Sequence, residues 1–293
     1  MKRLISALIL ALLIATPSLG QQSLVGTYNI VSHEVRYTDG TTMQVMGKAP
    51  HGYLVLTPTR YLSFYTADNR KFGTSDADKA ALLDTLSGWS GTYRIEGSKM
   101  IIAVDVSWTE VWTGKDLSRN WGLSGNRLTL TSDPQPDPRN LKTHVVQTVW
   151  EKTEIAPPSL GQQSLVGTYK IVSHEAQVGD SIEQPLGKSP HGYLVITPTE
   201  LIYFMTAENR KFGTSVADKA ALLDTLSAFS GAYRVEGNKL FIKGDASWLE
   251  NWTGKDQVRT WELLGNRLRL TVSGQHPRTS KAAIGRMVWE KIE

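Results

Sequence analysis

The chain has 293 residues, no cysteine and a formal net charge of +4. The lack of cysteine excludes disulfide bonds, thiolate metal sites and cysteine nucleophiles. The weak positive charge, with no cluster of Lys and Arg, lacks the electrostatic footprint of a nucleic-acid-binding protein.

The first 20 residues predict a secretory signal peptide. Lys2 and Arg3 are followed by an almost wholly apolar stretch over residues 4–15, and the small residues Ser18 and Gly20 favour cleavage after Gly20. The apolar run is about a dozen residues, too short for the roughly 20 that a membrane-spanning helix needs. We therefore expect a periplasmic or secreted protein without a stable membrane span.

The remainder of the chain is a tandem repeat. Residues 17–28 (PSLGQQSLVGTY) recur unchanged at 158–169, and the match continues to the closing VWEK segments at 149–152 and 288–291. Two copies are too few for a solenoid, whose units cannot bury a core alone. We predict a signal peptide at 1–20, one domain at 21–152, a linker at 153–158 and a second domain at 159–293.

Most of each copy has the alternation and the β-forming residues of strands. In the first copy we expect strands at 24–37, 52–57, 60–66, 93–96, 99–106, 117–123, 127–131 and 143–152. Gly97-Ser98 and Gly125-Asn126 predict hairpin turns. Alternation places Leu128 and Leu130 inward.

One helix interrupts the strands in each copy. Ser75 and Asp78 predict a capped start, apolar residues continue at helical spacing to Trp89, and Gly88 and Gly91 predict its end. The second copy repeats this pattern from residue 215. The expected fold class is all-β, with two tandem antiparallel barrels that each carry one inserted α-helix on or over one end. An open sandwich is the alternative.

The polar residues predict no metal or cofactor site. The six histidines lack metal-ligand spacing, and no Gly-x-Ser-x-Gly nucleophile motif occurs. Asp105 lies in an apolar strand, either as a buried acid with a raised pKa or as an acid at the barrel mouth that bonds Arg119.

The aromatic residues predict a pocket for an apolar ligand, or else they simply fill the barrel. Arg70 and Arg210, just before the helix, could hold an anionic head group. The full set of candidate ligand-binding residues is Tyr53, Tyr65, Arg70, Tyr93, Asp105, Trp108, Trp112, Arg119 and Trp121 in the first copy, with Tyr193, Arg210, Tyr233, Asp245, Trp248, Trp252, Arg259 and Trp261 in the second. Exchanges such as Tyr65 for Met205 predict different ligands for the two copies.

Each copy resembles the lipocalin-like domain family of bacteria and fungi. The resemblance is carried by residues 24–28 (LVGTY), 51–54 (HGYL), 90–93 (SGTY), 112–114 (WTG), 125–130 (GNRLTL) and 149–151 (VWE). It implies a lipocalin-type barrel but no particular activity. Family members often carry histidines on the strand that here reads Met100-Ile101-Ile102-Ala103, so any role of those histidines is missing from this chain.

These observations predict an exported protein that binds a small apolar or amphipathic molecule. Two alternatives stay open. One is a barrel-confined isomerase or cyclase in which Asp105 or a tyrosine moves a proton. The other is an envelope protein-interaction module with solidly packed barrels. The sequence leaves enzymatic activity, ligand identity and oligomeric state undecided.

Overall fold

The computed structural model describes residues 19–137, 140–154, 157–275 and 281–293. The predicted signal peptide lies outside these residues except for Leu19 and Gly20, which begin α1 (Leu19–Leu24). The predicted cleavage point therefore falls inside a helix of the first domain. The linker predicted at 153–158 is described only in part.

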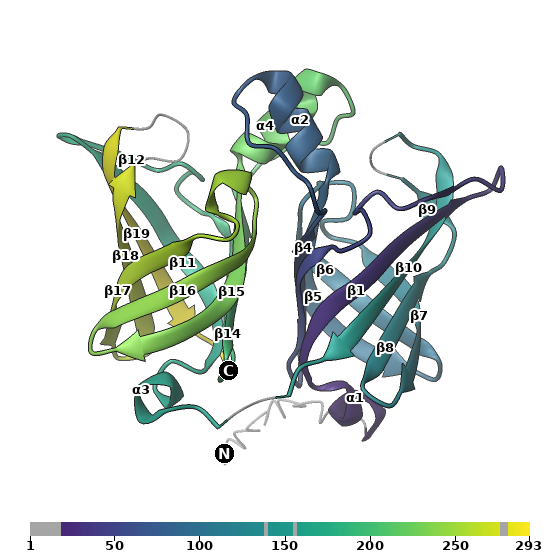
Figure 1. The fold of residues 1–293 in the computed structure, drawn as a ribbon, viewed down its shortest axis with the longest axis horizontal. Helices are drawn as coiled ribbons and strands as arrows, with labels where there is room; N and C mark the ends of the chain where they lie inside the picture. Colours follow the sequence, from purple (N-terminus) through teal and green to yellow (C-terminus); the bar gives the residue numbers. More distant parts are fainter. Residues whose placement is uncertain (1–18, 138–139, 155–156, 276–280) are drawn as a thin grey trace, which may run out of the picture.

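The first copy is a closed antiparallel barrel of eight strands, as predicted (Figure 1). Its strands follow the chain around the barrel, and pairing of the first with the last closes it. The barrel strands are β1 (Gly26–Tyr37), β3 (His51–Leu56), β4 (Arg60–Thr66), β5 (Leu86–Glu96), β6 (Lys99–Ser107), β7 (Asp116–Ser124), β8 (Arg127–Ser132) and β10 (Thr143–Lys152), with the short β2 (Thr42–Met43) and β9 (Gln135–Pro136) at its edges.

The second copy repeats this barrel after the short α3 (Leu160–Gln163), and β11 pairs with β19 to close it. Its strands are β11 (Gly167–Val178), β12 (Ser181–Glu183), β13 (His191–Ile196), β14 (Glu200–Thr206), β15 (Leu226–Glu236), β16 (Lys239–Ser247), β17 (Asp256–Leu264), β18 (Arg267–Gln275) and β19 (Ala282–Lys291), with a 3₁₀ turn η1 (Glu250–Trp252). Closure leaves neither barrel with a long exposed edge strand. The open sandwich is thereby excluded.

The local signals in the sequence explain most strand faces and turns. Leu128 and Leu130 are buried in β8 while Arg127 is exposed, as the alternation predicts. Gly97 and Gly125 both have a φ of 60°, which hairpin turns require and which glycine adopts without strain.

The predicted helix ends earlier than expected. Helix α2 (Asp76–Asp84) starts with the predicted capping box of Ser75 and Asp78, but it ends at Thr85, and Trp89 belongs to β5. Gly88 and Gly91, which were predicted to end the helix, instead let neighbouring atoms approach the backbone closely. A Cβ on Gly91 would lie 2.2 Å from the carbonyl oxygen of Ala103, and one on Gly88 would lie 2.5 Å from the Phe204 ring of the other barrel.

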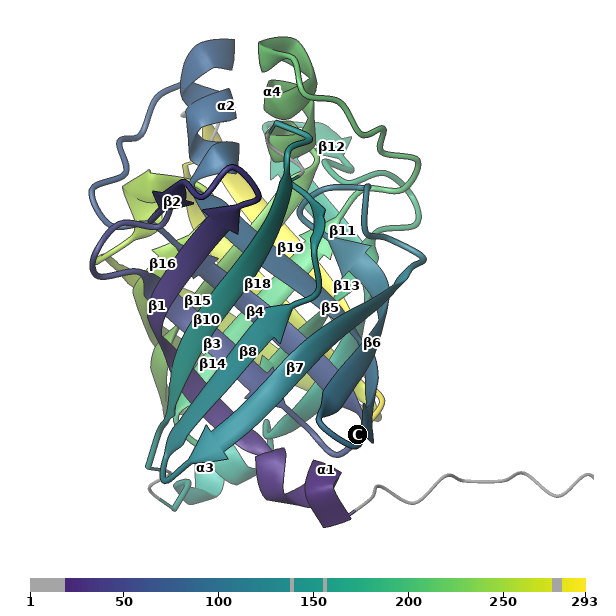
Figure 2. The same cartoon turned by 90° about the vertical axis from the view of Figure 1, so that its right-hand side faces the viewer.

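Helices α2 and α4 (Val216–Asp224) do not cover their own barrels. They pack against each other above the junction of the two barrels (Figures 1 and 2). Lys79 pairs with Asp224 at 2.6 Å, and Lys219 pairs reciprocally with Asp84 at 2.8 Å. The expectation that each helix lies on or over one end of its barrel is therefore wrong, because each helix buries its apolar side against the helix of the other copy.

The apolar core of the first barrel continues across the junction to the facing strands of the second barrel, whose interior forms a separate cluster. Phe64 of β4 and Phe204 of β14 point out of their barrels and meet with ring centroids 6.3 Å apart. The cluster of buried residues around them includes Leu82, Leu222 and Ala228. Burial on both faces explains why every residue of β4 and β14 is buried.

Candidate functional site

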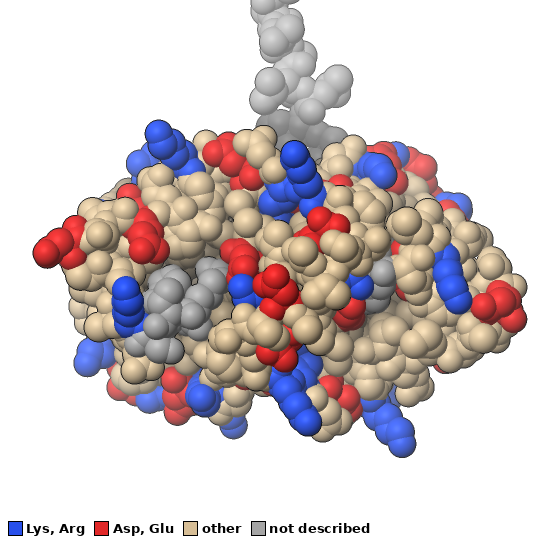
Figure 3. All heavy atoms as spheres, turned by 90° about the horizontal axis from the view of Figure 1, so that it is seen from above, with Lys and Arg blue, Asp and Glu red and all other residues tan. Residues whose placement is uncertain are grey.

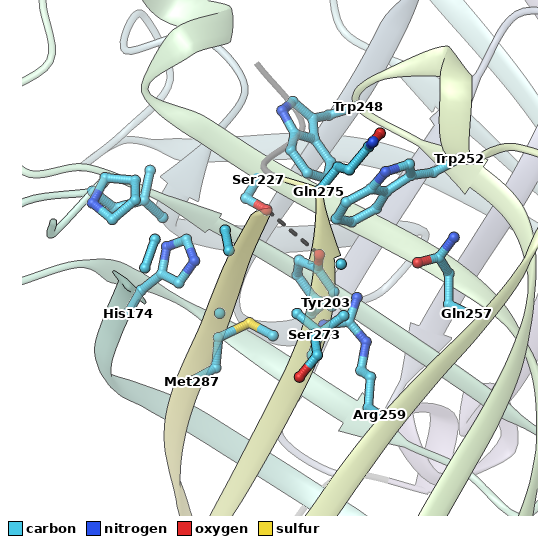
Figure 4. A pocket seen from close by; sticks show the side chains of 17 residues that line it. His174, Tyr203, Ser227, Trp248, Trp252, Gln257, Arg259, Ser273, Gln275 and Met287 are labelled. Atoms are coloured by element: carbon cyan, nitrogen blue, oxygen red, sulfur yellow. Dashed lines mark hydrogen bonds between the residues drawn. The ribbon is translucent and has the colours of Figure 1, made fainter. Parts of the chain in front are cut away.

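The second barrel encloses a cavity of about 150 Å³ near the end where α4 leads into β15 (Figure 4). Its wall comes from β11, β14, β15, β17, β18 and β19 together with the loop around Trp248 and Trp252. The lining residues are His174, Ala176, Pro185, Leu186, Tyr203, Ser227, Trp248, Trp252, Gln257, Arg259, Val272, Ser273, Gly274, Gln275, Ala283, Gly285 and Met287. No acidic residue is among them.

The same place in the first barrel is nearly filled. The cavity there measures about 30 Å³, room for a few water molecules at most. It is lined by His33, Tyr61, Tyr65, Ser87, Trp89, Trp112, Arg119, Leu130, Gln135, His144, Val146, Thr148 and Trp150. The two copies share one fold but differ in whether their interior is occupied by side chains.

Small residues on the closing strand open the second barrel. Where β10 carries His144 and Val146, β19 carries Ala283 and Gly285, as the pairing of each strand with β1 or β11 shows. In the first barrel the His144 ring also packs beside Tyr37, with centroids 6.1 Å apart. The His144 imidazole and the two Val146 methyl groups fill this end of the first barrel. The second barrel lacks these groups, so the corresponding space is open.

Among the described residues, Arg259 is the one Lys or Arg in the wall of the second cavity. It is 1 % exposed, and its Nε and Nη2 have no hydrogen-bond partner within the described part of the chain. Its guanidinium carbon lies 5.7 Å from the Tyr203 ring centroid and 5.8 Å from that of Phe229. A buried guanidinium with unused donors costs free energy unless something bonds to it.

The remaining polar groups of the wall include further hydrogen-bond donors. The indole Nε1 of Trp248 is buried without a partner among the described residues, and the Tyr203 hydroxyl contacts the Ser227 hydroxyl at 3.4 Å. Trp248 and Trp252 stand edge to face, with centroids 4.9 Å apart at 84°. In Figure 4 the two indoles lie on one side of the cavity, with Arg259 and Met287 on the other.

The structure brings six of the predicted site residues to these two cavities. Trp248, Trp252 and Arg259 line the second cavity. Tyr65, Trp112 and Arg119 line the first. The other eleven lie between the barrels, at the opposite end of a barrel, or in packed core.

Arg70 and Arg210 connect the two barrels and do not face a cavity. Arg70 donates from Nη1 to the Ser247 carbonyl at 2.6 Å and to Glu250 at 3.1 Å, and from Nη2 to the Trp248 carbonyl at 3.1 Å. Nε and Nη2 also bond Thr85 and the Leu82 carbonyl within its own copy. Every donor nitrogen is thus engaged, so a ligand head group has no place here.

Arg210 repeats these bonds in the opposite direction, to the carbonyls of Ser107 and Trp108 and to Glu110 at 2.8 Å. Burial lowers the pKa of each arginine to about 10, against the opposing effect of its glutamate partner. The sequence could not reveal this role because the partners are about a hundred or more residues away.

Asp105 and Asp245 also lie between the barrels. Asp105 pairs with Arg60 at 2.7 Å, and Arg60 stacks on Tyr193 with 3.5 Å to the ring centroid. The predicted bond between Asp105 and Arg119 is therefore absent, since the Asp105 side chain points out of the barrel. Asp245 lies 3.7 Å from His51 and bonds the Gly52 backbone, and burial raises the pKa of Asp245 against the opposing effects of these two groups.

The remaining predicted residues are structural in this fold. Tyr53 lies in the buried cluster between the barrels, close enough to Asp245 for that charge to help raise the pKa of Tyr53. Tyr93 and Tyr233 donate to the carbonyls of Thr57 and Thr197. Trp108, Trp121 and Trp261 pack in or against the cores and do not line either cavity.

Sequence reasoning missed several residues that shape the second cavity, above all Tyr203, Ala283, Gly285 and Met287. A usable signal was present in the differences between the copies. Position-by-position comparison gives Ser63 for Tyr203, His144 for Ala283 and Val146 for Gly285, which is a change of volume at each inward position. Attention to aromatic residues alone could not find a site that small residues create.

Across the described residues, no helix is long and apolar enough to cross a membrane, and no cluster of three or more His, Asp or Glu could hold a metal ion. On the face that carries α2 and α4, acidic and basic side chains are intermixed (Figure 3). This face therefore offers no single-sign surface to a polyanion.

The match to a known family agrees with the fold. Residues 25–153 and 166–292 match the lipocalin-like domain family. A search of curated proteins found no match. Among solved structures, a DUF3598-family protein of unknown function from Nostoc punctiforme shares 9% identity over 92% of this chain and 97% of its own, with a TM-score of 0.26. A mutant of transferrin binding protein B from Haemophilus parasuis shares 9% identity over 84% of this chain and 62% of its own, also with a TM-score of 0.26. The two family matches together span most of the sequence, so this chain belongs to the lipocalin-like domain family and carries that domain twice in tandem.

Proposed function

We propose that this protein is exported through its N-terminal segment and binds a small, mostly apolar molecule inside its second barrel. The observation that carries the proposal is the cavity of about 150 Å³ in that barrel, against about 30 Å³ in the first. An apolar cavity of about 150 Å³ engineered into another protein binds benzene, so the size suits a ligand with one ring. Concave, mostly apolar sites with a few polar groups are typical of small-molecule binding.

In this proposal the first barrel is a structural partner. Its interior is filled by its own side chains, and it contributes most of the shared apolar cluster and one of the two reciprocal arginines. The proposed ligand count is therefore one per chain, in place of the two that the duplication suggests.

The duplication also supplies the test. A variant with Ala283→His and Gly285→Val gives the second barrel the residues of the first, and we expect it to stay folded and to lose binding. Toluene serves as the probe, and its binding is followed as a rise in Tm, because a ligand at 100 times its Kd stabilises the folded state by about 2.7 kcal/mol.

The reciprocal variant, with His144→Ala and Val146→Gly, is the matched control. It should raise the number of bound probe molecules per chain toward two by opening the first barrel. Equal toluene binding by the wild type and the filled variant would exclude the second cavity as the site. Export is tested separately, by locating the processed protein in periplasmic or culture fractions.

The enzyme alternative receives no support from the acid on which it relied. Asp105 and Asp245 lie between the barrels and outside both barrel cavities, although Asp105 lines an open hollow of about 370 Å³ there; no described Asp or Glu lines the second cavity. The interaction-module alternative matches the packed first barrel but not the second.

A further inference from the structure

Resting on the proposed function, we propose that the ligand of the second barrel is an anion, a small aromatic carboxylate whose charge is held by Arg259. Among the described residues, the cavity wall contains this one Lys or Arg and no Asp or Glu. No ion pair joins Arg259 to an acidic residue of the described chain, and two of its three nitrogens lack any partner. A ligand carboxylate would supply the missing charge and the missing acceptors.

Comparison with Arg119 shows that the second barrel has lost an acidic residue that accompanies this arginine in the first. Arg119 lies 5.0 Å from the Trp89 ring centroid, and the negative charge of Asp133 favours its charged form. In the second copy Phe229 takes the place of Trp89, 5.8 Å from Arg259, but the uncharged Ser273 stands where the first copy has Asp133.

The two tyrosines beside Arg119 are exchanged as well. The Tyr61 and Tyr65 phenols, whose effect on Arg119 is to favour its charged form, are replaced by Leu201 and Met205. The arginine itself is retained. An arginine that is retained where an acidic residue and two tyrosines are replaced, and where the space beside it opens, is what a site for an external anion requires.

The rest of the wall defines the body of the ligand. Trp248, Trp252 and Tyr203 surround a space the size of a single ring, and the wall includes Leu186 and Met287. Aromatic walls favour a planar ring through offset and edge-to-face contacts. The unpartnered Nε1 of Trp248 offers a second donor, for an acceptor atom elsewhere on the ligand.

Calorimetry with benzoate and with benzyl alcohol, an uncharged molecule of similar shape, tests the proposal on the full-length mature protein. We expect the wild type to bind benzoate at least tenfold more tightly than benzyl alcohol, and the preference to shrink as salt is added. Arg259→Met should remove the benzoate preference and leave toluene binding in place. Arg259→Lys, which keeps the charge, should retain part of the preference.

Arg119→Met is the matched control, because the same change in the closed barrel should leave benzoate binding unaltered. If Arg259→Met fails to fold, the comparison rests on Arg259→Lys, which should bind benzoate less tightly than the wild type and toluene equally well. Equal affinity of the wild type for benzoate and benzyl alcohol, with toluene still bound, would overturn the anion assignment and leave the proposed function intact. Failure of all three probes to bind would overturn both.

Discussion

Single residues at equivalent positions of the two copies have acquired opposite surroundings. Asp105 pairs with Arg60, but the counterpart of Arg60 is Glu200, whose carboxylate bonds Thr197 and Thr199, so within the described residues no guanidinium pairs with Asp245. Desolvation is the largest cause of the raised pKa of Asp245, and His51 offsets it only in part. The carboxylate of Asp105 is stabilised by its arginine, whereas the equivalent carboxylate of Asp245 destabilises the folded state because burial penalises its charge.

Asp245 makes the stability of the fold depend on pH in a definite direction. The pKa of Asp245 is raised in the folded state, so between the ordinary aspartate value and the raised value the folded state binds more protons than the unfolded state. Stability from this group is therefore lost as the pH rises through that window and stays lost at neutral pH. We expect Asp245→Asn to be more stable than the wild type at pH 7, and the gain to vanish below the ordinary aspartate pKa.

Urea unfolding at several pH values measures this effect, and Asp105→Asn is its counterpart. That change leaves the buried Arg60 without its carboxylate, so it should destabilise the protein by about 1–3 kcal/mol at pH 7. Destabilisation of both variants at pH 7 would contradict the contrast between the two sites.

Among the elements, the crossed helices α2 and α4 and the loops beneath them hold the barrels together. Arg70 is buried and bonds three carbonyl or carboxylate oxygens of the other copy. Arg70→Met would leave these acceptors unsatisfied and Glu250 without its cation. We expect a loss of about 3 kcal/mol, because removing one partner of a buried pair strands the other.

Arg210→Met should cost the same within error, since its contacts are reciprocal. Arg94→Met, at an exposed pair with Glu96, should change stability by less than about 1 kcal/mol. Chemical denaturation of the three variants gives the comparison. A loss for Arg70→Met no greater than that for Arg94→Met would mean that the arginine contacts contribute little.

Elements were more predictable than sites because their signals are local. Alternation and turn glycines gave strands such as β4 and β10 with their correct bounds, and Ser75 with Asp78 gave the helix start. The helix end was misjudged at Gly88 and Gly91, since a glycine required by close approach of another strand or ring looks the same in the sequence as one that ends a helix. Arg259 was found, but the roles of Arg70 and Asp105 depend on packing between the copies, which no local pattern encodes.

At the scale of the whole molecule, the two barrels should behave as one cooperative unit. One buried apolar cluster joins the first barrel to the junction-facing strands of the second, and ion pairs cross the junction in both directions. We expect a single unfolding transition in which circular dichroism and tryptophan fluorescence coincide. Two separated transitions would show that the shared core couples the barrels weakly.

We expect the two folded barrels to stay associated after the linker between them is cut. A protease site placed between Thr153 and Pro158 would cut the chain far from α2, α4 and the paired arginines. We expect the two pieces to elute together from a sizing column after cleavage. Separation of the pieces into two smaller species would contradict the extent of the junction described here.

The reciprocal contacts across the junction have the form of an isologous dimer, in which one surface of a subunit meets its own copy about a two-fold axis. In a true homodimer every substitution appears twice, so a residue that opens one pocket opens both, and a charge change such as Arg60 to Glu200 must be tolerated on both sides at once. Joining the subunits in one chain lifts this constraint and raises their effective concentration. One half can then specialise as a rigid support while the other exchanges core packing for an empty interior, an asymmetry that identical subunits cannot encode.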